Sequence, residues 1–186
     1  MQSLPGIRCL RQAFLFHERE TPKDMRMKNN YIIRRFIAAD APEVRNIICR
    51  GLHEVNGRDY PAERIERYCN VYTIEKILSQ AENTHMYVAV SETNRILGTG
   101  SIAPYFGSET ESILLTIYVM PELIGSGIGT AIIKKLETDE YFLRASRIEI
   151  PASVTAMTFY RKMGYLPKDG QQKPDEEGLF RMVKFR

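Results

Sequence analysis

A strand, a glycine-rich loop and a helix follow one another between residues 112 and 136, and this unit most narrows the choice of fold. Residues 113–119 are apolar almost without alternation, which is typical of a strand covered on both faces at the centre of a sheet. After Pro121, residues 125–129 hold three glycines, and apolar residues at helical spacing follow. Because glycines let the backbone approach a ligand and the first turn of a helix has free N–H groups, this junction predicts an anion-binding site.

Two familiar phosphate-binding loops do not fit this segment. A dinucleotide-binding fingerprint needs a third glycine where Thr130 stands, and a Walker loop needs Gly-Lys-Ser/Thr where residues 130–132 read Thr-Ala-Ile. Glu149 does end a later strand, as a ribose-binding acid would, but this match does not restore the failed loop. A nucleotide-binding α/β domain therefore stays a weaker alternative, beside a loop that simply requires positive φ.

The rest of the chain predicts further strands and helices around this unit. Residues 86–91 and 96–103 read as a β-hairpin joined by a short polar turn. Residues 1–29 show no clear period, so we predict an N-terminal extension of unknown role ahead of one domain at 30–186. By periodicity we also expect strands at 31–36, 148–150 and 179–185 and helices at 43–52, 62–68, 73–81 and 153–163, the last capped by Ser153.

Charge and hydropathy argue against two classes of partner. Residues 1–30 contain six Lys or Arg against three Asp or Glu, which accounts for the whole formal charge of +3. The remaining body is neutral and has no basic stripe for a phosphate backbone, so no nucleic-acid partner is expected. No stretch reaches the roughly 18 to 20 apolar residues of a membrane span, and we expect neither membrane association nor a cleavable signal.

The cysteines and histidines indicate neither a disulfide framework nor a metal site. Cys9, Cys49 and Cys69 are odd in number, widely spaced and without a CxxC pair. We therefore expect free thiols and a reducing, cytoplasmic location. The histidines are scattered along the chain, and no metal is predicted.

Two separate segments resemble the Gcn5-related N-acetyltransferase (GNAT) superfamily. The sequence Tyr-Val-Met-Pro at 118–121, followed by Gly127 and Gly129, resembles motif A, Q/R-x-x-G-x-G/A, with Ile124 at the position of Gln or Arg. Residues 152–165 resemble the later family segment Ala-Ser-x-x-Ala-x-x-Phe-Tyr-x-x-x-Gly-Phe/Tyr. The two segments occur in the family order with a helix and a strand between them, and the resemblance extends over about residues 31–186.

The resemblance implies an α/β (α+β) fold with a mixed, mostly antiparallel sheet of roughly six to seven strands flanked by about four helices. It also implies acetyl-CoA as co-substrate and direct transfer of acetyl to a primary amine of a small molecule or peptide. The family often pairs through its terminal strands, which leaves a homodimer open. By position, the residues implied at the cofactor are Ile117, Tyr118, Val119, Ile124, Gly125, Ser126, Gly127, Ile128, Gly129, Thr130, Ser153 and Phe159.

The resemblance also implies catalytic roles. Tyr160 matches the family's general acid, since a phenol with a pKa of about 10 can protonate a leaving thiolate. Glu111 begins the central strand and by the two-residue period shares a face with Ile113, Ile117 and Val119, so it is the candidate base, directly or through water. Glu109 is a rival, and a chain of waters alone is a further option.

The acceptor pocket of this superfamily is usually shaped by the early helices. In this sequence that points to Glu54, Asn56, Asp59 and Tyr60, among which the carboxylates would suit a cationic amine. A turn that merely connects two helices is an equally good interpretation of these residues. The alternative function is a non-catalytic acetyl-CoA-binding or protein-interaction module on the same fold.

Overall fold

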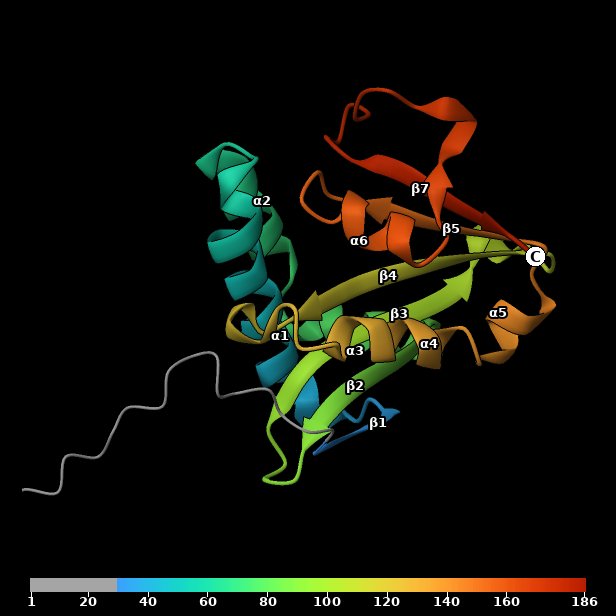
Figure 1. The fold of residues 1–186 in the computed structure, drawn as a ribbon. Helices are drawn as coiled ribbons and strands as arrows, with labels where there is room; N and C mark the ends of the chain where they lie inside the picture. Colours follow the sequence, from blue (N-terminus) through green and yellow to red (C-terminus); the bar gives the residue numbers. More distant parts are fainter. Residues whose placement is uncertain (1–29) are drawn as a thin grey trace, which may run out of the picture.

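The computed structural model describes residues 30–186, and the extension predicted at residues 1–29 lies outside them. Within the described part, the strands form one open sheet in the order β1-β2-β3-β4-β5-β7-β6 (Figure 1). As the apolar run predicted, β4 lies at the centre of this sheet. The strands are β1 (Tyr31–Arg35), β2 (His85–Ser91), β3 (Ile96–Pro104), β4 (Glu111–Val119), β5 (Arg147–Ala152), β6 (Leu166–Pro167) and β7 (Phe180–Phe185).

Neighbouring strands are antiparallel throughout, except for β4 and β5. These two strands run parallel and pair only from Glu111↔Arg147 to Ile113↔Glu149. Beyond Ile113 they diverge (Figure 1), so the edge of β4 that faces β5 has no strand partner there. The prediction of a mixed, mostly antiparallel sheet is confirmed.

Helices cover both faces of the sheet. In residues 30–186 there are six α-helices, where about four were expected. One of the additional helices, α5, has only five residues, which is too few to show a helical period in the sequence. The helices are α1 (Ala41–Arg50), α2 (Ala62–Val71), α3 (Ile74–Asn83), α4 (Ile128–Leu136), α5 (Glu140–Arg144) and α6 (Met157–Lys162).

Helix α4 packs very closely on β3, and this contact fixes where the helix begins. A Cβ added at Gly100 would lie 2.6 Å from Cγ2 of Ile132, and one added at Gly98 would lie 2.9 Å from Cδ1 of the same residue. Ile128 and Ile132 are almost fully buried at this contact. The two glycines thus let α4 lie against the sheet with its N-terminus beside the end of β4.

A β-bulge interrupts β4 at Thr116, which has a left-handed φ of 55°. Ser101 of β3 pairs with Leu115, but Thr99 pairs with Tyr118, so β4 contains one residue more than β3 over this stretch. An extra residue reverses the alternation of side chains between the two faces. The predicted common face of Glu111, Ile117 and Val119 is therefore wrong, because the bulge lies between the first residue and the other two.

The structure joins Cys49 and Cys69 in a disulfide, with 5.2 Å between their Cα atoms. The expectation of free thiols at these two positions was wrong. The two residues are 20 apart in sequence and show no recognisable motif, but α1 and α2 bring them side by side. The bond ties these two helices together. No helix among the described residues has the length and apolar character that crossing a membrane requires.

Candidate active site

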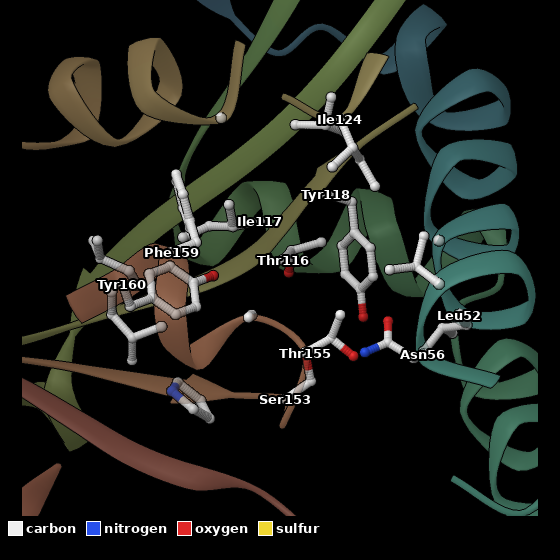
Figure 2. A pocket seen from close by; sticks show the side chains of 18 of the residues that line it. Leu52, Asn56, Thr116, Ile117, Tyr118, Ile124, Ser153, Thr155, Phe159 and Tyr160 are labelled. Carbon is white, nitrogen blue, oxygen red and sulfur yellow. The ribbon is translucent and has the colours of Figure 1, made fainter. Parts of the chain in front are cut away.

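A cavity of about 560 Å³ lies where β4 and β5 diverge (Figure 2). Its walls come from residues 114–119 of β4, from residues 150–153 at the end of β5, and from α6. The glycine-rich loop before α4 closes one end, and the region around α1 and α2 closes the other. The cavity therefore joins the predicted anion-binding loop to the predicted acceptor region.

The glycine-rich loop presents unpaired backbone amides to this cavity. Gly125 and Gly127 have φ values of 90° and 94°, and a Cβ at either position would meet nothing within 4 Å. At the centre of the loop, the Ser126 amide donates to the Leu123 carbonyl at 3.1 Å. Within residues 30–186, no acceptor is found for the amides of Gly125, Gly127, Ile128, Gly129 and Thr130. Such a set of free donors at a helix N-terminus suits a diphosphate.

Most residues predicted at a cofactor line this cavity. The exceptions are Ser126, whose hydroxyl is also bonded to the Leu123 carbonyl, and Ile128, whose side chain is buried in the core. Ser153 was expected to cap a helix, but α6 begins only at Met157, after a turn in which the Ala156 amide donates to the Ser153 carbonyl. The predicted residues that line the cavity are Ile117, Tyr118, Val119, Ile124, Gly125, Gly127, Gly129, Thr130, Ser153 and Phe159.

Tyr160 of α6 directs its hydroxyl into the cavity (Figure 2). Its side chain is only 5% exposed, and burial raises the pKa of its phenol well above the usual range. No hydrogen-bond partner for this hydroxyl is found in the described part of the chain. The group is thus a protonated donor that faces empty space rather than another protein group.

Glu111 does not reach the cavity. Its carboxylate accepts a hydrogen bond from Arg147 at 3.1 Å, at the end of β4 that is paired with β5. At about 3.4 Å per residue, roughly 20 Å of strand separate it from Ile117. The rival, Glu109, is exposed and does not line the cavity either. Neither carboxylate is in place to accept a proton there.

The predicted acceptor residues divide into two pairs. Asn56 and Tyr60 line the cavity, whereas Glu54 and Asp59 do not. Glu54 accepts from Arg50 at 2.7 Å, and Asp59 accepts from the hydroxyl of Thr155. The expected role of the two carboxylates is therefore not supported, because both are engaged elsewhere.

Several cavity residues had no signal in the sequence. Tyr68 lies in the last turn of α2 and Tyr72 follows directly after the helix, a four-residue spacing that is equally typical of a core-facing stripe. Thr116 occupies the bulge, and the Gln80 side chain of α3 donates to its hydroxyl and to that of Ser101. These hydrogen bonds connect the bulge to α3. Nothing in the sequence distinguishes Gln80 from the other polar residues of the predicted helices.

Known proteins share both the motif region and the fold. Residues 82–167 match the family model described as the acetyltransferase (GNAT) domain. A search of curated proteins gives no match. Among solved structures, PaiA N-acetyltransferase from Thermoplasma acidophilum, in complex with coenzyme A, is 17% identical with a TM-score of 0.72, covering 84% of this chain and 99% of that chain.

Two further solved structures agree. A Gcn5-related N-acetyltransferase from Rhodopseudomonas palustris is 21% identical with a TM-score of 0.68, covering 83% of this chain and 95% of that one. A GNAT family acetyltransferase from Brucella melitensis, in complex with acetyl-CoA, is 18% identical with a TM-score of 0.60, over 83% and 87% of the two chains. At these identities the likeness establishes the fold.

Proposed function

Since residues 82–167 match the model of the acetyltransferase (GNAT) domain, we propose that this chain binds acetyl-CoA in the cavity and transfers the acetyl group to a primary amine. The observation that carries the proposal is a set of unpaired amides at the start of α4, at one end of a cavity that also contains the Tyr160 hydroxyl. Two structures of the same fold are complexes with coenzyme A and acetyl-CoA, which supports this choice of co-substrate.

In the proposed complex, the diphosphate of acetyl-CoA binds the free amides between Gly125 and Thr130. The unpaired edge of β4 beyond Ile113 offers main-chain donors and acceptors to the amide groups of the pantetheine arm, as an added strand would. Ile124 stands where the family has a polar side chain and is exposed, so the contacts at this point come from the backbone. The thioester then lies near Tyr160.

The proposed reaction is direct transfer. A neutral amine attacks the thioester carbonyl, the C–N bond forms, and the C–S bond breaks. The leaving thiolate takes a proton from the Tyr160 phenol, which burial keeps protonated by raising its pKa. The amine nitrogen loses its extra proton to water, and solvent restores the phenol. A backbone amide near the bulge can donate to the carbonyl oxygen as it becomes negative.

The direct test measures coenzyme A release and the mass of the acetylated amine over a panel of amines. At acetyl-CoA about 100 times its Kd, linkage predicts about 2.7 kcal/mol of stabilisation, seen as a rise of several degrees in Tm, and no rise with NAD or ATP. Stabilisation without transfer to any amine would instead favour the non-catalytic binding module.

The pH dependence of kcat/KM is expected to follow the amine. Of the described residues that line the cavity, Glu177 alone has a carboxylate, and this group accepts a hydrogen bond from Arg181. Water is therefore the base in the proposed reaction. Below the pKa of the amine, kcat/KM should rise about tenfold per pH unit, because the fraction of the amine that is neutral rises by this factor. Because burial raises the pKa of Tyr160, the acid stays protonated and no fall is expected up to about pH 10.

Measuring the pH–rate profile with two acceptor amines of different pKa tests whether the protein supplies a base. The inflection of the pH–rate profile should move with the pKa of the amine. A shared inflection near about pH 7 for both amines would reveal a base on the protein and contradict the proposal.

Replacing Gly51 with Ala should lower kcat/KM for the acceptor. A Cβ at Gly51, which begins the π-helical turn η2 (Gly51–Val55), would lie 2.8 Å from the Tyr118 ring. The ring must then move within the cavity, where overpacking of this kind costs roughly 1–3 kcal/mol of folding stability. We expect the displaced ring to misplace the acceptor and to lower kcat/KM about tenfold. The matched control is Gly57→Ala, whose Cβ meets the Leu52 carbonyl at an ordinary 3.7 Å. Equal losses in both variants would contradict this assignment.

A further inference from the structure

The cavity has aromatic walls. Tyr60, Tyr68 and Tyr72 line it from the α2 side, and Tyr118 and Tyr160 line it from β4 and α6. Tyr72 and Tyr118 meet edge to face across the cavity wall, with 6.5 Å between their ring centroids. The group that the proposed transfer would acetylate has to enter between these rings.

Two of these tyrosine hydroxyls, those of Tyr60 and Tyr68, are bonded to the protein. Tyr60 donates to the Gly178 carbonyl at 2.8 Å and accepts from the Val154 amide at 3.0 Å, while Tyr68 donates to the Glu177 carbonyl at 3.4 Å. These bonds attach the loop before β7 to α2. The two rings therefore offer mainly carbon surface to a ligand, and their hydroxyls are not free to solvate a second charge.

The cavity also lacks an available negative charge. Of the described lining residues, Glu177 alone carries a carboxylate, and that group accepts a charge-assisted hydrogen bond from Arg181. Lys162, which is positively charged, lines the same cavity. Burial raises the pKa of Tyr118 well above its usual range, and the neighbouring Tyr72 acts in the same direction. The surroundings are thus poorly hydrated, and an unpaired cation there is costly.

We infer that the acceptor is an arylalkylamine, a primary amine on a short chain that ends in one aromatic ring, and not a polyamine or aminoglycoside. This inference rests on the proposed acetyl transfer and adds its substrate class. The ring of the acceptor packs among the tyrosines, and its amine points toward Thr116 and Tyr160, which line the same cavity from β4 and α6 (Figure 2). A polyamine would bring at least one further cation between the same rings, with no carboxylate to receive it.

The experiment compares kcat/KM for 2-phenylethylamine, ethylamine, putrescine, spermidine and a peptide with a free N-terminus, at saturating acetyl-CoA. We expect 2-phenylethylamine to exceed ethylamine and both polyamines on the order of 100-fold, because burial of its ring is favourable. A higher kcat/KM for a polyamine or for the peptide overturns the inference and leaves acetyl transfer standing. Acetylation of no amine overturns the proposed function, and the inference with it.

A pair of isosteric variants tests the electrostatic part separately. Val55 is half-buried and lines the cavity, so Val55→Asp adds a carboxylate there and Val55→Asn adds a neutral group of the same shape. Relative to Val55→Asn, we expect Val55→Asp to raise the ratio of kcat/KM for putrescine over 2-phenylethylamine by at least about tenfold. An unchanged ratio would mean that charge does not select the acceptor, and would contradict the inference.

Discussion

Replacing Tyr160 with Phe lowers kcat by about 10²- to 10⁴-fold, the usual contribution of a positioned general acid. Phenylalanine fills the same space, so the affinity for acetyl-CoA stays nearly unchanged. The hydroxyl that is lost faces the cavity and has no partner in the described residues, so its removal leaves no other group unsatisfied. The measurement is steady-state kinetics together with calorimetric titration of acetyl-CoA.

The matched control for this variant is Tyr165→Phe. Tyr165 is fully buried close to Tyr160, but its hydroxyl donates to Glu137 at 3.3 Å and it does not line the cavity. It should lose some stability and keep its kcat. If Tyr160→Phe and Tyr165→Phe have the same kcat, the leaving thiolate is protonated by another group.

Replacing Gly127 with Asp weakens acetyl-CoA binding on the order of 100-fold or more relative to Gly127→Asn. Gly127 is the N-cap of α4, with a left-handed φ that Asn and Asp both tolerate better than other side chains, and a Cβ there meets no neighbour. The two variants differ only in charge. A carboxylate about 4 Å from a phosphate costs about 4 kcal/mol at an effective dielectric constant of about 20, before screening by salt.

The same carboxylate is favourable for the protein without ligand. An acidic N-cap stabilises a helix through its free amides and dipole, so Gly127→Asp should unfold no more easily than Gly127→Asn. Relative to Gly127→Asn, the Gly127→Asp variant should therefore bind acetyl-CoA more weakly without a lower free energy of unfolding. Calorimetric titration and thermal unfolding measure the two effects, and equal affinities for acetyl-CoA would show that no anion binds at this helix terminus.

The sequence predicted those parts of the site that depend on local backbone geometry. The glycines from Gly125 to Gly129 suit positive φ or the close approach of a ligand whatever surrounds them, and Tyr160 was identified from the resemblance of residues 152–165 to a short family segment. Both are properties of a few consecutive residues. The mixed, mostly antiparallel sheet could also be inferred, because the resemblance extends over most of the described chain.

What could not be predicted depends on contacts between distant segments. The bulge at Thr116 changes which side chains share a face, and its support comes from Gln80 on another element. The bond between Cys49 and Cys69 depends on how α1 packs against α2. Glu111 has the chemistry of a base, but the pairing of β4 with β5 gives its carboxylate to Arg147.

The divergence of β4 from β5 gives the protein an edge strand in the middle of its own sheet. Exposed strand edges are sites where other extended chains attach, and natural sheets usually shield them. Here residues 114–119 lie within the cavity between two halves of the molecule, so only a narrow, extended molecule can complete their hydrogen bonding. An extended molecule bound along this edge would therefore add to the sheet between β4 and β5 and contact the elements on both sides of the cavity.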